Sequence, residues 1–85
     1  MTTTQNLIHW AYLNRGVSKA KKGDHYGAIS DYIKALEINP NDATAYKNIG
    51  IAKENLGDMK SACEDWRKAS SLGDRQTPQW IRDQC

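Results

Sequence analysis

Long apolar runs are missing from this sequence. No stretch reaches the roughly 18 consecutive apolar residues that predict a membrane-spanning helix. The first residues, Met1–Asn6, have neither the basic start nor the apolar centre of a secretory signal. We therefore expect a protein that does not interact with membranes and that resides in the cytoplasm.

A strong excess of charge of either sign is also missing. The chain has 12 Lys and Arg residues and 10 Asp and Glu residues, which gives a net charge of +2, and both signs are spread along it. Proteins that bind nucleic acid usually carry a clustered basic patch, so the balance argues against such a partner. The one basic run, Lys19–Lys22, falls at the expected end of a helix, where the helix dipole favours cations.

Few residues are available for catalysis or metal binding. The only His and Cys residues are His9, His25, Cys63 and Cys85, and their spacing matches no zinc pattern. The glycines form no phosphate-binding loop, and no spacing argues for a Ser/His/Asp arrangement. We therefore predict no catalytic residue, no cofactor and no metal site.

The two cysteines do not amount to a disulfide framework. Cys63 is expected to be a small buried apolar residue, and Cys85 an exposed thiol open only to adventitious intermolecular disulfides. Asp31 and Asp65 occupy equivalent helix positions, and we interpret both as part of a solvated face rather than as a pair of reacting carboxylates.

The dominant feature of the 85-residue chain, which is short enough for one domain, is a helical segment that occurs twice. Residues 28–38 place apolar side chains at spacings of three and four, as one face of a helix requires, and Pro40 then ends the helix. The same pattern returns 34 positions later, and a fixed period of this size indicates stacked repeats. Matched pairs include Tyr12 with Tyr46, Gly16 with Gly50, Lys19 with Lys53, Gly23 with Gly57, Ala28 with Ala62, Asp31 with Asp65 and Ala35 with Ala69.

Turn and capping signals divide the chain into five expected helices and no strand, so the predicted class is all-α. The first helix is expected to start between residues 6 and 9 and to end at residue 22, after a frayed tail over residues 1–5. The other four are expected to span about residues 25–38, 43–56, 59–71 and 78–84. Gly23 and Gly57 should break the first and third helices, and Asp24, Asp42 and Asp58 should cap the helices that follow. Thr77 is expected to cap the last helix ahead of Pro78.

The pattern resembles the tetratricopeptide repeat, a helix–turn–helix unit of 34 residues with an aromatic, a glycine, an alanine and a second aromatic at set positions. Tyr12, Gly16, Ala28, Tyr32, Ala35 and Pro40 match it in the first unit, and Tyr46, Gly50, Ala62, Trp66 and Ala69 in the second. The end of the chain, from Ala62 onward, resembles the ends of small bacterial repeat proteins. The resemblance implies residues 1–8 as a tail and helix start, repeats over 9–42 and 43–76, and a capping helix over 77–85.

The capping helix carries Trp80, which lies 34 positions after Tyr46 and is expected to pack near the fourth helix. Small residues such as Gly16 and Gly50 should let helix backbones approach, while large aromatic residues fill the space between helices. Two repeats plus a cap fall below the roughly three usually needed for stability. We therefore also predict a homodimer that covers Leu7, Ile8 and Trp10.

By resemblance, the first helix of each pair lines a concave face that binds a peptide. The implied residues are Trp10, Leu13, Asn14 and Val17 from the first helix, Lys47, Asn48, Ile51 and Asn55 from the third, and Arg82 from the last. Some family members clamp the carboxylate of acidic chaperone tails, but Leu13, Val17 and Pro78 here cannot supply that clamp. We expect a partner segment with apolar residues toward Trp10 and an acidic group toward Lys47 and Arg82.

The predicted function is thus a non-catalytic module that binds a peptide segment of a partner protein. The alternative is a structural protein that assembles with its own copies through the exposed ends of the solenoid, and an enzymatic role comes third. A further alternative concerns Asn14 and Asn48, whose side chains would in that case only hydrogen-bond within their own repeats.

Overall fold

The structure is a computed structural model that describes residues 3–85. Five helices follow one another: α1 (Thr3–Lys21), α2 (His25–Ile38), α3 (Ala43–Asn55), α4 (Met59–Ser71) and α5 (Thr77–Gln84). No strand occurs between residues 3 and 85, and the all-α prediction is confirmed. None of the helices so described has the length and apolarity needed to cross a bilayer.

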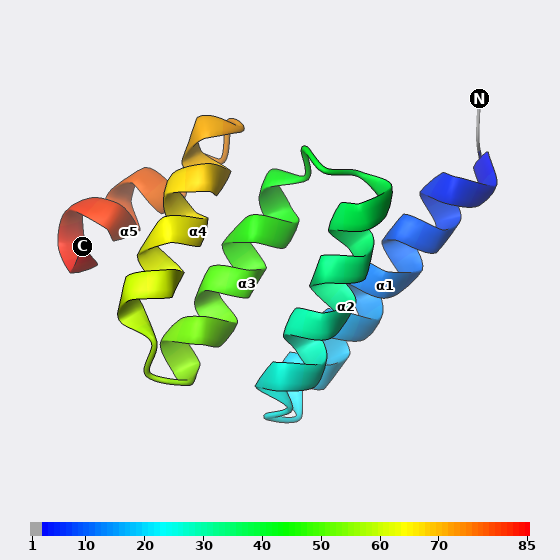
Figure 1. Cartoon of the computed structure of the whole chain (residues 1–85), viewed down its shortest axis with the longest axis horizontal. Helices are drawn as coiled ribbons and strands as arrows, with labels where there is room; N and C mark the ends of the chain where they lie inside the picture. Colours follow the sequence, from blue (N-terminus) through cyan, green and yellow to red (C-terminus); the bar gives the residue numbers. More distant parts are fainter. Residues whose placement is uncertain (1–2) are drawn as a thin grey trace.

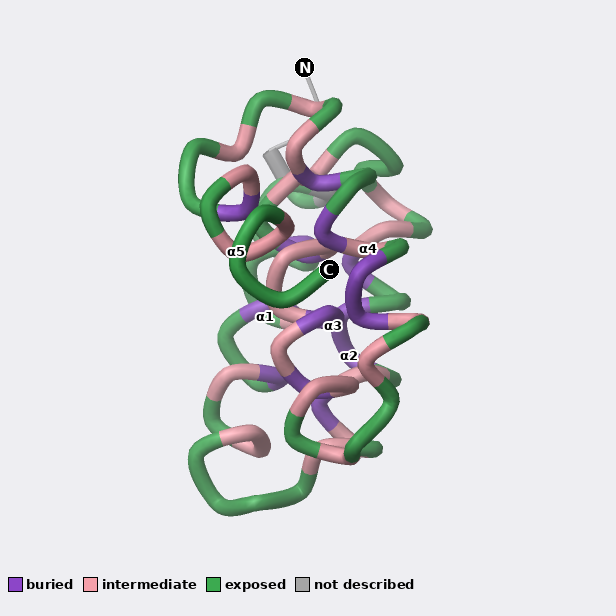
Figure 2. Tube along the Cα trace, turned by 90° about the vertical axis from the view of Figure 1, so that its left-hand side faces the viewer, coloured by how far each residue is buried: buried purple, intermediate pink, exposed green. Residues whose placement is uncertain are grey.

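The helices stand side by side in chain order and form a short solenoid (Figure 1). Each helix packs on the next one, and α1 also touches α3. The molecule measures 39 × 27 × 15 Å, so it is a thin slab in which no residue lies far from the surface. Figure 2 shows the buried residues gathered along the middle of the slab, between the helices.

The core consists of two clusters: the first lies among α1, α2 and α3, and the second lies on α4 where α5 packs against it. Aromatic residues fill each cluster, since Tyr32 is 2% exposed and Trp66 is fully buried. Trp80 packs on the second cluster, with its ring centroid 5.3 Å from that of Trp66, which confirms its predicted place beside α4. The first cluster comprises Leu13, Ala28, Tyr32, Ala35, Ala45 and Ile49, and the second Ala62, Cys63 and Trp66.

Two glycines allow the helices of each hairpin to approach closely. A Cβ atom at Gly16 would lie 2.6 Å from Cε1 of Tyr32 and 3.2 Å from the carbonyl oxygen of Ala28. A Cβ atom at Gly50 would likewise collide with the indole of Trp66. The predicted pairing of small and large residues is therefore confirmed in both hairpins.

The helix ends follow the predicted signals in most places. Asp24, Asp42 and Asp58 cap α2, α3 and α4, and each accepts hydrogen bonds from backbone N–H groups of the first turn. Gly23 and Gly57 follow α1 and α3 at positive φ, a conformation that glycine adopts without steric cost. These local signals work because each acts within about four residues of the helix end.

Two predicted boundaries are wrong. The first helix starts at Thr3, ahead of the predicted 6–9, and of the predicted tail only residues 1–2 lie outside the described residues. Thr77 does not cap α5 but is its first residue. The capping acceptor is instead Asp74 Oδ2, which accepts hydrogen bonds from the N–H groups of Gln76 (3.0 Å) and Thr77 (2.8 Å).

The prediction that the cysteines form no intramolecular disulfide is wrong as well. Cys63 and Cys85 are joined, with their Cα atoms 6.1 Å apart, which is within the usual span of a disulfide. Cys63 is buried, as predicted, and Cys85 is exposed. The pair meets because α5 folds back along α4 and brings the end of the chain over the middle of that helix.

The interpretation of Asp31 and Asp65 as a solvated face is also wrong. Only 1% of the Asp31 side chain is exposed, and its carboxylate receives hydrogen bonds from Arg15 Nε (2.8 Å) and Nη2 (2.7 Å) and an ion pair from Lys19 (3.2 Å). Asp65 is 17% exposed and pairs with Lys53 at 2.8 Å. Each carboxylate points across its hairpin toward cations of the preceding helix rather than toward water.

Candidate functional site

The nine residues of the predicted peptide-binding face all lie on α1, α3 and α5. These helices alternate in the chain with α2 and α4, and in Figure 2 α1 and α5 lie on the opposite side of the slab from α4. The face therefore draws on helices from both hairpins and from the cap. It comprises Trp10, Leu13, Asn14, Val17, Lys47, Asn48, Ile51, Asn55 and Arg82.

Two of the four residues that α1 contributes are exposed, one is half-buried and one is buried. Trp10 is 57% exposed, Asn14 is exposed, and Val17 is half-buried against the first core cluster. Leu13 is only 5% exposed and belongs to that cluster, so its side chain stabilises the fold and cannot line the face as predicted. Trp10, Asn14 and Val17 follow one another at helical spacings of four and three, which puts them on one side of α1.

The contribution of α3 is more recessed. Lys47, Asn48 and Ile51 are half-buried and Asn55 is exposed. Within residues 3–85 neither Asn14 nor Asn48 has a side-chain hydrogen bond. The alternative that these amides serve hydrogen bonds inside their own repeats thus gains no support, and both amides retain donors and acceptors for a ligand.

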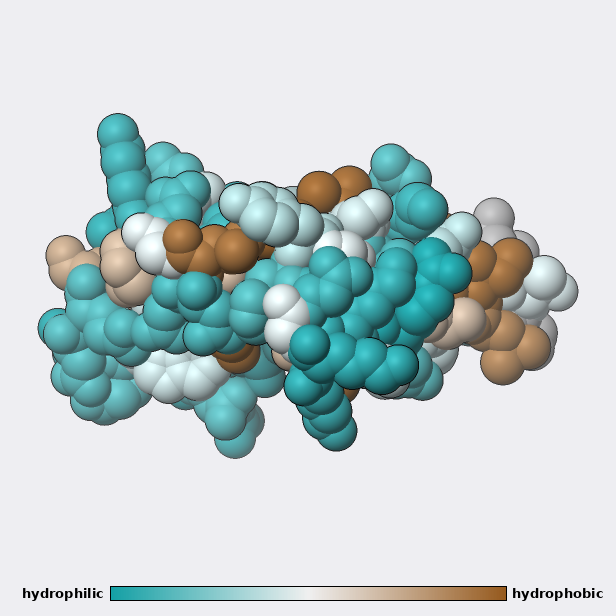
Figure 3. All heavy atoms as spheres, turned by 90° about the horizontal axis from the view of Figure 1, so that it is seen from below, coloured by the Kyte–Doolittle hydropathy of each residue, from teal (hydrophilic) through white to brown (hydrophobic). Residues whose placement is uncertain are grey.

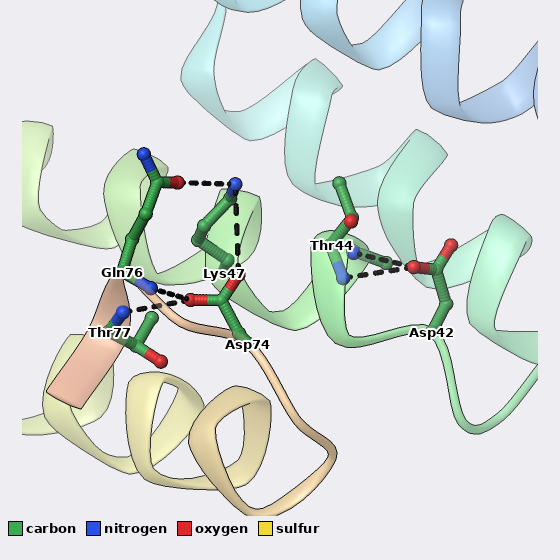
Figure 4. A network of polar contacts seen from close by, with 7 residues as sticks. Asp42, Thr44, Lys47, Asp74, Gln76 and Thr77 are labelled. Carbon is green, nitrogen blue, oxygen red and sulfur yellow. Dashed lines mark hydrogen bonds and ion pairs between the residues drawn. The ribbon is translucent and has the colours of Figure 1, made fainter.

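Lys47 is tied to the start of α5. Its Nζ donates to Gln76 Oε1 at 2.8 Å and lies 3.8 Å from Asp74 Oδ1 (Figure 4). Burial acts to raise the pKa of Asp74, but the hydrogen bonds from Thr77 and Gln76 and the charge of Lys47 outweigh it and lower that pKa. Lys47 therefore joins α3 to the capping helix, and its charge is partly compensated.

Arg82, the predicted second cation, is exposed on α5. Its Nη2 donates to Gln79 Oε1 at 2.8 Å, one turn earlier on the same helix. Gln79 in turn donates to Asp83 through its Nε2. Arg82 is thus held by a local chain of exposed polar groups, whose hydrogen bonds a ligand can replace at small cost.

The region that the sequence analysis missed is the ionic centre of each hairpin. Hydrogen bonds from Arg15, against the cost of burial, lower the pKa of Asp31, and Lys19 adds to the effect. Burial raises the pKa of Asp65, whose carboxylate is paired with Lys53. The second repeat offers no counterpart of Arg15, because Ile49 occupies the equivalent position. The repeated Lys and Asp positions were the signal that would have predicted these pairs.

A further side-chain contact joins α1 to the start of α3. His9 Nε2 lies 2.6 Å from Asp42 Oδ2. Asp42 Oδ1 in turn accepts hydrogen bonds from the backbone N–H groups of Thr44 and Ala45 at the start of α3, and Figure 4 shows how Asp42 caps this helix. His9 is 9% exposed. Its contact with Asp42 joins α1 to α3 and holds the neighbouring Trp10 at the edge of the face.

An apolar patch remains uncovered at the N-terminal end of the solenoid. Leu7 is 65% exposed, Ile8 42% and Trp10 57%. In Figure 3 apolar residues gather at this end of the molecule, whereas polar residues cover most of the middle. We call these three residues the N-terminal apolar patch.

Comparison with known families agrees with this geometry. A family model described as "TPR repeat" matches residues 16–57, from the second half of α1 through α2 and α3. The chain is a tetratricopeptide-repeat protein. No curated protein matches it.

Tetratricopeptide repeats are in general non-catalytic modules for protein–protein interaction, and this defines the broad class of the protein. The matched region includes five residues of the predicted face: Val17, Lys47, Asn48, Ile51 and Asn55. The others lie outside the match.

Proposed function

We propose that this tetratricopeptide-repeat protein binds a peptide segment of a partner protein on the face formed by α1, α3 and α5. The observation that carries the proposal is the placement of a largely exposed Trp10 on the same side of α1 as Asn14, whose side-chain amide has no hydrogen bond to any of residues 3–85. A Trp that loses its water on binding is a common energetic anchor. Asn14 and Asn48 supply donors and acceptors for the backbone of an extended or helical ligand.

The chemistry of the face favours a ligand with an apolar residue and an acidic group. The apolar residue would pack on Trp10 and Val17. The acidic group would lie toward Arg82 and Lys47, where Lys47 is already shared with Asp74 and Gln76 and would contribute the weaker attraction. We propose a protein or peptide partner rather than a nucleic acid or a membrane.

The test uses peptides selected from a random displayed library on the immobilised protein, with Kd measured by fluorescence anisotropy. Removal of an anchoring Trp typically costs about 2 kcal/mol or more, or about thirtyfold in Kd. We expect that loss for Trp10→Ala. For Asn48→Ala we expect about fivefold, the value of one hydrogen bond of about 1 kcal/mol.

Ile33→Ala is the matched control, because Ile33 is a large apolar side chain on α2 that is 46% exposed. It should leave Kd unchanged. If Trp10→Ala and Asn48→Ala bind the selected peptides as the parent does while remaining folded by circular dichroism, the proposed face is not the site.

The second candidate function is assembly with another copy through the N-terminal apolar patch. Two observations favour it: the exposure of Leu7 and Ile8, and the lack of any Asp, Glu, Lys or Arg before Arg15. Two identical charge-free surfaces can meet without like-charge repulsion. Sedimentation at micromolar concentration should then show a dimer that Leu7→Ser with Ile8→Ser dissociates, and a monomeric parent would contradict it.

The remaining parts of the proposal concern organisation and location. We propose two 34-residue repeats over 9–42 and 43–76 and a cap over 77–85, in a bacterial scaffold-type protein. We also propose the cytoplasm as its location. Disulfides that occur in that compartment are usually transient or redox-sensing. In the cytoplasm the Cys63–Cys85 disulfide would therefore be exposed to reduction.

A further inference from the structure

The disulfide connects the capping helix to the last repeat through one buried and one exposed cysteine. Cys63 lies in the middle of α4 and is 6% exposed, whereas Cys85 lies just beyond α5 and is exposed. Cys63 belongs to the second core cluster, against which Trp80 and Ile81 of α5 pack, so a thiolate from solution reaches the disulfide more readily from the side of Cys85. Access is one of the factors that decide which sulfur of a disulfide is attacked.

The disulfide also lies at an open, positively charged pocket. Lys60 and Arg67 line a hollow of about 290 Å³ together with Cys63 and Cys85. Lys60 precedes Cys63 by three positions and Arg67 follows it by four, so both belong to the same side of α4. Within residues 3–85 neither cation forms an ion pair with a carboxylate, so their charge is available to this pocket.

We propose that the Cys63–Cys85 disulfide is a thiol–disulfide exchange site for a dithiol reductant of the thioredoxin type. One thiolate of the reductant attacks Cys85 Sγ, the S–S bond breaks, and its electron pair leaves on Cys63 Sγ. Lys60 and Arg67 stabilise that leaving thiolate. The second thiol of the reductant then attacks the mixed disulfide and releases Cys85 as a thiolate, so the reductant becomes a disulfide and this chain gains two electrons and, after protonation, two thiols.

Reduction has a structural consequence, because α5 is short. Its eight residues contact α4 mainly through Trp80 and Ile81, and Cys85 N–H bonds back to the carbonyl of Ile81. Helices of this length are unstable alone in water. Without the disulfide the end of α5 keeps this hydrogen bond and the exposed side-chain bonds among Gln79, Arg82 and Asp83, which water can replace, so we expect the last turn to unwind and to carry Arg82 with it.

The decisive experiment traps the first step. The oxidised full chain is mixed with a thioredoxin whose resolving cysteine is replaced by serine, and the mixed disulfide is mapped by proteolysis and mass spectrometry. We expect the adduct on Cys85. An adduct on Cys63, or a disulfide that stays closed to thioredoxin until the chain is unfolded in guanidinium chloride, would overturn the proposal.

The role of the cations is tested by the rate of reduction with dithiothreitol. A change of about one unit in the pKa of the leaving thiol, with a slope near 0.5, corresponds to about threefold in rate. We expect Lys60→Gln with Arg67→Gln to slow reduction by about this factor. The control is Lys68→Gln, because Lys68 lies over the Tyr46 ring and not in the pocket; equal rates for all three proteins would contradict the assignment.

A readout of structure completes the test. On reduction, amide hydrogen exchange should accelerate at the end of α5 and stay unchanged in α2, and the parent should return to its original pattern on reoxidation. Unchanged exchange in α5 would show that the disulfide does not hold the capping helix.

Discussion

The buried carboxylate of Asp31 provides a sharp test of how the hairpins are stabilised, because the molecule contains its own control. Asp31 and Asp65 occupy the same position of the two repeats. Asp31 contacts Arg15 twice and Lys19 once, whereas among residues 3–85 the one cation paired with Asp65 is Lys53. The substitutions Asp31→Asn and Asp65→Asn therefore remove the same charge from two different electrostatic environments.

The expected loss for Asp31→Asn follows from these contacts. Hydrogen bonds to charged groups contribute about 1.5–3 kcal/mol each. The new amide can still accept one of them, and the Arg15 side chain, which is 54% exposed, regains water. We therefore expect the free energy of unfolding at pH 7 to fall by about 2–3 kcal/mol, which lowers Tm by about 10–20 °C for a domain of this size.

The matched substitution Asp65→Asn should behave differently. Burial raises the pKa of Asp65, which means that the fold disfavours its charged form. Replacement by a neutral amide removes this unfavourable charge together with one ion pair. We expect the free energy of unfolding at pH 7 to stay the same or to rise by up to about 1 kcal/mol.

The pH dependence gives a second signature. The pKa of Asp31 is lower in the folded than in the unfolded chain, so its contribution is present above the unfolded pKa and is lost as the pH falls through the folded value. The pKa of Asp65 is higher in the folded than in the unfolded chain, so its ionisation destabilises the fold at pH 7. This destabilisation decreases as the pH falls through the pKa of the folded chain, and it is absent below the pKa of the unfolded chain.

The assay monitors unfolding in urea by far-ultraviolet circular dichroism, with the disulfide kept oxidised. The dependence of the free energy of unfolding on urea concentration, the m-value, is compared between variants. The gap between the parent and Asp31→Asn should narrow as the pH is lowered from 7 toward 3. If Asp65→Asn costs as much as Asp31→Asn, or if the gap is independent of pH, the assigned role of the Asp31 ion pairs is incorrect.

Three further substitutions test the packing and the capping helix. Gly50→Ala should lower the free energy of unfolding by about 1–3 kcal/mol in urea titrations, because its methyl group would collide with Trp66; an unchanged midpoint would contradict the close approach. Trp80→Ala should lower the free energy of unfolding by about 2 kcal/mol, less than the ~3–5 kcal/mol of a fully buried Trp, because Trp80 is only half-buried. An unaltered Tm in calorimetry would show that α5 does not stabilise the fold. Asp74→Ala removes the acceptor of two N–H groups, so amide exchange in α5 should accelerate, and parent-like exchange would argue against capping.

Features set by neighbouring residues were predictable from the sequence. The 34-residue period, the glycine breaks and the aspartate caps predict four of the helices to within one residue, apart from the start of α1, because each signal acts locally. The interlocking of Gly50 with Trp66 was predictable too, since the repeat brings the same small and large positions together twice.

Features that depend on how helices distant in the sequence pack together were not predictable from the sequence. The burial of Asp31 depends on where Arg15 and Lys19 reach across the hairpin, and the Cys63–Cys85 bond depends on the course of α5 over α4. The spacing of Leu13 along α1 fits the face as well as the core, and only the position of the helix decides between them. The peptide-binding face itself stays a prediction, because it concerns a second molecule.

The most direct test of that face is a nuclear magnetic resonance footprint. The amide spectrum of the isotopically labelled protein would be recorded during titration with a selected peptide. Our account predicts that the largest shift changes fall on α1 and α3, with the Trp10 indole and the side-chain amides of Asn14 and Asn48 among them, and that the exposed sides of α2 and α4 are unaffected. Shift changes centred on α2 and α4, with the signals of those three side chains unchanged, would contradict the proposed binding face.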